Sequence, residues 1–145
     1  EISGEPRLDT SELPKGVIWA KLRGGPGMSS PVASGDYIYV CSRGFLSCYN
    51  TKTGQEAYKS RLPSSKSIAA SMWADDKHVF LMDESGKAYV VKAGPEFKIV
   101  GENDLDDLFW STPAATKGTL LLRGANKLYC IREKKPLPNC EITGP

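Results

Sequence analysis

The chain has 145 residues, of which 40% are hydrophobic and 25% are charged, and its formal net charge is +2. This composition is typical of a globular domain and excludes an intrinsically disordered chain. No run approaches the roughly 20 apolar residues that span a bilayer, and no basic stripe carries stacking aromatics. The sequence therefore predicts neither a membrane span nor a nucleic-acid partner.

The N-terminal part divides into a leader and one strand. Residues 1–15 predict a flexible leader without the basic and apolar regions of a signal peptide. The chain begins without Met, which fits a processed protein or a piece of a longer one. Residues 16–28 contain the apolar run Gly16–Leu22, which includes Trp19 and resembles a later run at Glu56–Leu62. We therefore predict that residues 16–28 form the outer strand of a preceding structural unit.

Residues 29–66 predict a complete four-stranded antiparallel meander. Turn residues separate four short apolar runs, which are Ser29–Ala33, Tyr37–Cys41, Phe45–Tyr49 and Glu56–Leu62. Asn50 and Gly54 suit the longest turn, because Asn bonds its own backbone downstream and Gly tolerates positive φ. A two-residue turn at Arg43–Gly44 pairs Cys41 with Leu46, which places Cys41 and Cys48 on opposite faces and argues against a disulfide between them.

The same order of runs recurs twice. Residues 67–108 predict a second unit with strands at Ile68–Met72, His78–Met82 and Gly86–Val91. In this unit Gly94–Leu108 reads as a connection rich in Pro and charge, and Asp104–Phe109 is the one candidate for a helical turn. Residues 109–133 predict a partial unit, with strands at Ser111–Ala115, Thr119–Leu122 and Lys127–Ile131, and residues 134–145 predict a flexible tail.

The spacing of these copies defines the fold class. Gly44 and Gly86 lie 42 residues apart, and Tyr89 and Tyr129 lie 40 apart. A period of this size built from β-strands indicates a repeat array in which each unit buries its apolar face against its neighbours. We predict an all-β fold, a partial β-propeller of about three four-stranded antiparallel blades that occupies residues 16–133.

One segment connects these repeats to a known family. The run Cys48–Tyr58 is similar to the tryptophan-docking motif of pyrroloquinoline-quinone-type (PQQ-like) β-propellers, and the resemblance covers residues 16–133. Asn50 stands for the Asp of that motif, Thr53 and Gly54 for its Thr-Gly pair, and Tyr58 for its Trp. The resemblance implies that these four residues join neighbouring blades and belong to no active site. The second copy retains only Gly94 and Phe97 of the motif.

The catalytic members of this family bring further requirements. The resemblance to quinone-dependent dehydrogenases implies calcium ligands, a catalytic Asp, a stacking Trp and, in many, adjacent cysteines. Here the carboxylates cluster only at Asp104, Asp106 and Asp107 and at the pair Asp75–Asp76, which fit solvated connections better than a calcium loop. The single histidine, His78, has no spaced nucleophile or carboxylate partner. We therefore expect no cofactor, no metal site and no catalytic residue.

Two surface features favour binding instead. Trp73 and Trp110 precede turns, and a partner surface and inter-blade packing explain them about equally well. Three blades leave edge strands exposed, which predicts either a fragment of a larger propeller or self-association through those edges. A disulfide between Cys130 and Cys140 would join the C-terminal tail to the last strand, and only the geometry of the two residues decides whether it forms.

The resulting hypothesis is a non-catalytic protein-binding scaffold that resembles the outer-membrane assembly-factor type of propeller. We expect it to be a fragment of a larger periplasmic, secreted or envelope-associated protein whose partner the sequence does not name. The alternative hypothesis is a piece of a PQQ-dependent dehydrogenase whose active-site blades lie outside this chain.

Overall fold

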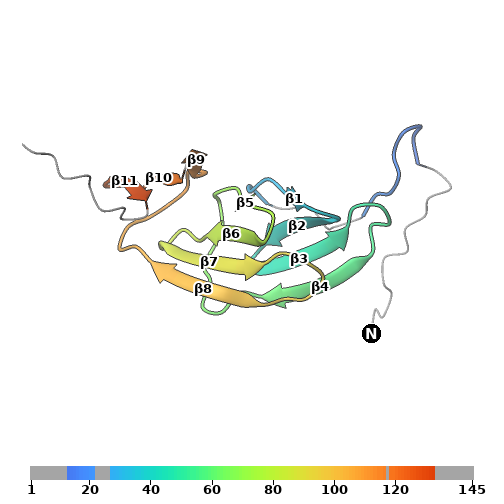
Figure 1. The fold of residues 1–145 in the computed structure, drawn as a ribbon, viewed down its shortest axis with the longest axis horizontal. Helices are drawn as coiled ribbons and strands as arrows, with labels where there is room; N and C mark the ends of the chain where they lie inside the picture. The colour runs from blue at the N-terminus through green and yellow to red at the C-terminus, as the bar shows by residue number, and fades with distance from the viewer. Residues whose placement is uncertain (1–12, 22–26, 117, 133–145) are drawn as a thin grey trace, which may run out of the picture.

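A computed structural model describes residues 13–21, 27–116 and 118–132 of the chain. In these residues the fold is all-β, with strands arranged in three separate antiparallel sheets (Figure 1). The first two sheets have four strands each and the third has three. The prediction of a partial propeller built from antiparallel meanders is therefore confirmed.

The first sheet, blade 1, follows the sequence order of its strands. They are β1 (Val32–Ser34), β2 (Tyr37–Ser42), β3 (Phe45–Asn50) and β4 (Glu56–Arg61). Arg43 and Gly44 both adopt positive φ, 52° and 77°, in the two-residue turn between β2 and β3. Such turns match the twist of a hairpin. Cys41 pairs with Leu46 as predicted, and Cys41 and Cys48 are both free and buried. The predicted placement of the two cysteines on opposite faces is wrong, because Leu46 and Cys48 are two positions apart in β3 and both thiols join the same core cluster.

The second sheet, blade 2, corrects three predictions. Its strands are β5 (Trp73–Ala74), β6 (His78–Met82), β7 (Lys87–Lys92) and β8 (Ile99–Asp104). The first strand begins after the predicted run Ile68–Met72, because Ile68 and Met72 pack in the core next to the sheet. Residues 94–108 are also more than a connection, since β8 pairs with β7 along its length. The strand β8 was not predicted because its sequence is polar, which its solvent-facing outer edge allows. No helical turn forms at Asp104–Phe109.

The third sheet, blade 3, has three strands in the part of the chain that the structure describes. They are β9 (Ala114–Thr116), β10 (Thr119–Arg123) and β11 (Leu128–Arg132), in the order β11-β10-β9. The upstream strand predicted at residues 16–28 is absent from the described residues 13–21, which form a turn and irregular backbone. The predicted leader at 1–15 and tail at 134–145 fall mostly or wholly outside the described residues.

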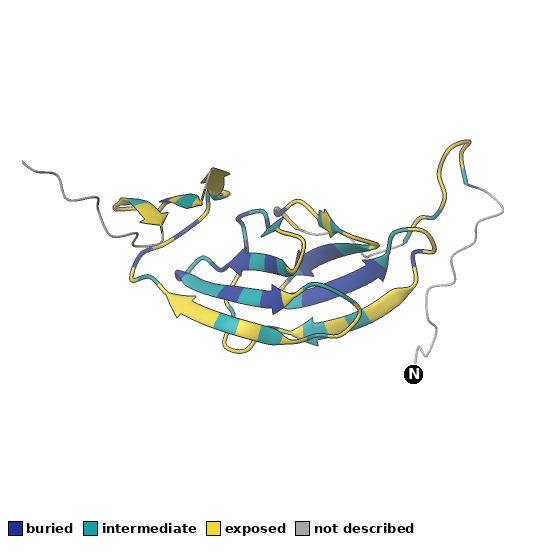
Figure 2. Ribbon diagram, viewed as in Figure 1, coloured by how far each residue is buried: buried dark blue, intermediate teal, exposed yellow. Residues whose placement is uncertain are grey.

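The core lies between the blades. Buried positions concentrate on the middle strands β2, β3, β6 and β7, whereas β4 and β8 form an exposed outer rim (Figure 2). Between blades 1 and 2, eleven buried residues form one cluster that includes Tyr39, Leu46, Leu81 and Tyr89. Between blades 2 and 3 the cluster has only three buried residues, namely Met82, Phe109 and Leu122.

A ladder of hydrogen bonds repeats the sequence period on the innermost side of the blades. The Ser30 N–H donates to Ser71 Oγ at 2.9 Å, and the Ser71 N–H donates to Thr112 Oγ1 at 3.1 Å. Both bonds join residues 41 positions apart. Equivalent residues of successive blades are therefore bonded directly to each other, and a spacing of 41 defines equivalence between blades.

Candidate functional site: the contacts between blades and the groove they leave

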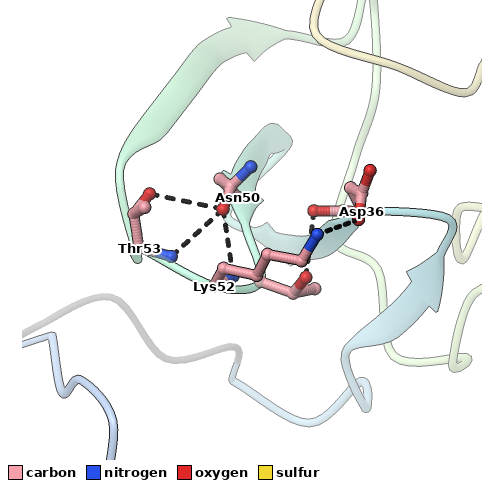
Figure 3. A network of polar contacts seen from close by, with 5 residues as sticks. Asp36, Asn50, Lys52 and Thr53 are labelled. Atoms are coloured by element: carbon pink, nitrogen blue, oxygen red, sulfur yellow. Dashed lines mark hydrogen bonds and ion pairs between the residues drawn. The ribbon is translucent and has the colours of Figure 1, made fainter.

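The turn after β3 is organised by one side chain. Asn50 Oδ1 accepts hydrogen bonds from the N–H groups of Lys52 and Thr53 at 3.0 and 3.1 Å, and it lies 3.3 Å from Thr53 Oγ1 (Figure 3). Lys52 Nζ pairs with Asp36 at 3.1 Å across the neighbouring turn. Three of the four residues of the proposed docking motif, Asn50, Thr53 and Gly54, thus belong to one rigid turn.

An indole that the sequence analysis did not assign to this turn lies on it. Trp19 Nε1 donates to the Thr51 carbonyl at 2.7 Å, and the Trp19 ring lies over Gly54. A Cβ at position 54 would approach the ring to 2.7 Å, and Gly54 also adopts a φ of 70°. Only glycine fits both the conformation and the contact. Part of the signal was present, because the run Gly16–Leu22 resembles Glu56–Leu62 and each run contains one aromatic residue, Trp19 or Tyr58.

Tyr58 occupies the corresponding place between blades 1 and 2. Its ring meets Phe97 edge to face, with centroids 5.5 Å apart. Burial raises the pKa of its phenol, and the hydroxyl has no hydrogen-bond partner among the described residues. Trp19 both packs on its turn and donates a hydrogen bond to it. Tyr58 makes only the apolar ring contact among the described residues.

Two buried aspartates hold the connections between blades, and the sequence analysis did not single out either role. Asp83 accepts from the Lys66 N–H at 3.0 Å and also from Ser85 and Lys87. It thereby ties the blade 1–2 connection to the β6–β7 hairpin. Buried aspartates of this kind are bonded to satisfy their oxygens.

Asp107 does the same between blades 2 and 3. It accepts from the Leu108 and Asn126 N–H groups, the Asn126 amide and the Tyr129 hydroxyl. Desolvation acts to raise the pKa of Asp107, but the hydrogen bonds from Leu108, Asn126 and Tyr129 outweigh it and lower the pKa. Asp107, predicted as part of a solvated acidic connection, is instead 7% exposed and structural. Asp104 ends β8 and lies apart from this network.

A groove of about 490 Å³ opens between blades 2 and 3. Trp73 and Phe80 form its blade 2 side, stacked with centroids 5.3 Å apart and planes 9° apart. Leu120 and Ile131 are among the residues of its blade 3 side. Trp73 is half-buried here, so one of the two tryptophans proposed as a partner surface lines an open, shallow groove whose walls are mainly apolar.

Trp110 lies elsewhere, before the first strand of blade 3, and 54% of it is exposed. Its repeat equivalent in blade 1 is Met28, which is 72% exposed. Each precedes a member of the serine–threonine ladder by two positions. Trp73 lines the groove and Trp110 does not, so the two tryptophans occupy different places in the fold.

The chemistry available at these sites is packing and hydrogen bonding. Among residues 13–21, 27–116 and 118–132, no three His, Cys, Asp or Glu side chains gather in a way that would hold a metal ion. The prediction that His78 has no carboxylate partner is wrong, because His78 Nδ1 lies 3.3 Å from Asp75 Oδ1 at an exposed turn. No helix in this described part is long and apolar enough to cross a membrane.

Comparisons with known proteins agree with this geometry. No protein-family model matches the sequence, and no curated protein matches it. Among solved structures, the chain is similar to BamB from Moraxella catarrhalis, with a TM-score of 0.63 and 15% identity over 79% of this chain. It is also similar to the quinohemoprotein alcohol dehydrogenase from Comamonas testosteroni, with a TM-score of 0.54 and 14% identity over 68% of this chain.

These likenesses establish the fold. The chain spans 35% of the length of the BamB structure and 17% of that of the dehydrogenase. The structure is therefore a partial β-propeller that resembles PQQ-like propellers, as the docking turn and the repeat period predicted.

Proposed function

We propose that this chain is a non-catalytic, protein-binding scaffold, part of a larger cell-envelope or secreted propeller. The observation that supports this proposal best is the groove between blades 2 and 3, where Trp73 and Phe80 present a half-buried apolar surface. Aromatic side chains in concave apolar sites are the typical anchors of protein interfaces. The likeness to BamB is consistent with the proposal, and so is the sequence resemblance to assembly-factor propellers.

The test compares capture by three forms of the chain. The unaltered chain is used as bait in an envelope extract of the source organism, beside Trp73→Ala and Trp110→Ala. Thermal unfolding confirms that each variant is folded. A protein captured by the unaltered chain, purified and shown to bind directly, is expected to bind Trp73→Ala at least about tenfold more weakly. Direct binding that neither substitution changes would contradict the groove as the partner site.

The likeness to the quinohemoprotein dehydrogenase requires a separate arm. Pyrroloquinoline quinone and Ca²⁺ are added to the chain, and the melting temperature and the reduction of a redox dye with an alcohol are measured. A binding scaffold shows neither a thermal shift nor dye reduction. A saturable thermal shift would favour the dehydrogenase piece over the scaffold.

A further inference from the structure

The face of blade 2 that is turned toward blade 3 carries a row of three rings. Val79 packs in the cluster between blades 1 and 2, and successive side chains of a strand point to opposite faces of a sheet. His78, Phe80 and Met82 therefore point toward blade 3, and Met82 belongs to the cluster between blades 2 and 3. The Phe80 ring lies between the other two rings, with centroid distances of 5.3 Å to Trp73 and 6.0 Å to His78. The groove therefore has an aromatic wall on its blade 2 side.

The interface between blades 2 and 3 is closed at one end and open at the other. Met82, beside the β6–β7 turn, packs with Phe109 and Leu122 in the buried cluster. Phe80 and Trp73 lie farther from that turn and line the groove. The open end is therefore the one at which β6 begins and at which β7 and β11 end.

Two cations lie at this open end. Arg132, the last residue of β11, is the only charged residue among the described residues that line the groove. Lys92, the last residue of β7, pairs with His78, and because Val91 packs toward blade 1, Lys92 is turned toward blade 3. Both side chains are exposed, and within the described ranges neither forms an ion pair with a carboxylate. The open end of a mainly apolar groove is therefore positively charged.

The carboxylates of the adjoining β5–β6 turn are engaged within that turn or lie outside the groove. Asp75 accepts from the N–H groups of Lys77 and His78 at 2.7 and 2.6 Å, and it also pairs with the His78 ring. Asp76 follows it in the turn, and neither aspartate lines the groove. An acidic group brought to the groove by a partner would therefore meet cations there.

We propose that the groove binds an extended acidic segment of a partner protein. A large apolar side chain of that segment packs against Trp73 and Phe80, and a neighbouring carboxylate pairs with Arg132 and Lys92. A guanidinium matches a carboxylate with two parallel hydrogen bonds, and charge pairs of this kind select among partners that share the same apolar anchor. The inference rests on the proposed function, because it names the chemistry of the partner for the same groove.

The experiment titrates the full chain with three synthetic peptides that have identical Gly-Ser flanks and differ in a central pair. The pairs are phenylalanine–glutamate, phenylalanine–glutamine and alanine–glutamate. Binding is followed by NMR through the indole N–H signal of Trp73, which the Trp73→Phe variant assigns. The same titrations use Arg132→Gln, Lys92→Gln and the double variant. Arg123→Gln, at an exposed arginine of blade 3 that does not line the groove, is the matched control, and circular dichroism verifies folding.

The phenylalanine–glutamate peptide is expected to bind the unaltered chain and the control equally. The phenylalanine–glutamine peptide binds the unaltered chain about two- to fivefold more weakly, which is the range of an exposed ion pair. Each single variant at Arg132 or Lys92 reduces this preference for glutamate, and the double variant abolishes it. The alanine–glutamate peptide binds at least about tenfold more weakly, because it lacks the aromatic anchor.

Two kinds of result would overturn the proposal, and they differ in what they leave standing. Equal binding of the two phenylalanine peptides, or a preference for glutamate that the double variant retains, would show that the acidic chemistry is wrong while the groove still accepts an apolar side chain. A Trp73 signal that no peptide shifts would show that the groove accepts none, which would also contradict its role in the proposed function.

Discussion

The two interfaces between blades use the same repeat and reach different degrees of closure. Between blades 1 and 2, Tyr39, Leu46 and Tyr89 are all fully buried within a large cluster. Between blades 2 and 3, Phe80 stands in the place of Tyr39, only Met82, Phe109 and Leu122 form the buried cluster among the described residues, and a groove remains beside Phe80. A shared fold period therefore fixes which positions face each other, whereas the side chains at those positions decide how far the interface closes.

The largest expected effect tests this difference at two equivalent leucines. Leu81 and Leu122 are 0% and 1% exposed and occupy the same position in blades 2 and 3. Substitution of a buried leucine by alanine costs about 2–5 kcal/mol, and more where neighbours cannot relax. We expect Leu81→Ala to lower the free energy of unfolding more than Leu122→Ala, as measured by urea denaturation. Equal losses would show that the two interfaces are equally tight.

A second comparison uses Gly86 and Gly124, two glycines that lie against the connection between blades 2 and 3. A Cβ at Gly86 would meet the backbone oxygens of Leu105 and Asp107, and φ there is 95°. At Gly124 it would meet only the side chain of Asp107. Gly86→Ala is expected to cost at least about 1–3 kcal/mol, because the backbone cannot yield as a side chain does. Thermal unfolding of both alanine variants should rank Gly86→Ala as the more damaging, and the reverse order would contradict this account of the connections.

The closed interface also predicts loss of stability at alkaline pH. Burial raises the pKa of Cys41 from 9.0 to about 12 and that of Cys48 from 9.0 to about 11. Above pH 9 the unfolded thiols lose protons while the folded thiols retain them. The contribution of the thiols to the free energy of unfolding is therefore full below pH 9 and decreases toward pH 11–12. Each thiol accounts for at most about 1.4 kcal/mol per pH unit in that window. Unfolding free energies at pH 8–10.5 should decline less steeply for Cys41→Ala/Cys48→Ala, and parallel slopes would exclude the thiols as the cause.

The smallest expected effect concerns the outer strand of blade 2. Gly101 pairs with Val90 as Tyr58 pairs with Cys48, so glycine stands where blade 1 has its docking aromatic. A Cβ at Gly101 would make only ordinary contacts with Val90 at 3.5 Å. Gly101→Ala should therefore raise the free energy of unfolding by about 0.5–1 kcal/mol, since glycine in a strand interior is destabilising. A destabilised variant in calorimetry would show that this position needs glycine.

Much of the fold followed from the sequence because alternation and turn chemistry are local. The turn at Arg43–Gly44 and the pairing of Cys41 with Leu46 required nothing beyond neighbouring residues. The strand β8 was missed because its exposed edge allows a polar sequence such as Glu102 and Asp104. Its partner Lys87, which pairs with Glu102 at 2.8 Å, is recognisable only once the register is known.

The candidate sites depended more on tertiary structure. The organisation of the turn by Asn50 was predictable from its spacing to Thr53, but the arrival of Trp19 joins residues 32 positions apart. The stacking of Trp73 on Phe80 and the groove beside them depend on how much volume blade 3 supplies. The groove and the burial of Asp107 both depend on contacts between blades, so a local sequence pattern predicts neither.

Hydrogen exchange of the native chain, read at individual amides, tests the unequal closure of the two interfaces most directly. We predict that amides of β2, β3, β6 and β7 exchange only through global unfolding, whereas those of β10 and β11 exchange through a smaller opening that requires less free energy. Protection factors that are equal in β6 and β10 would contradict the account, because they would show that blade 3 is held as tightly as blades 1 and 2.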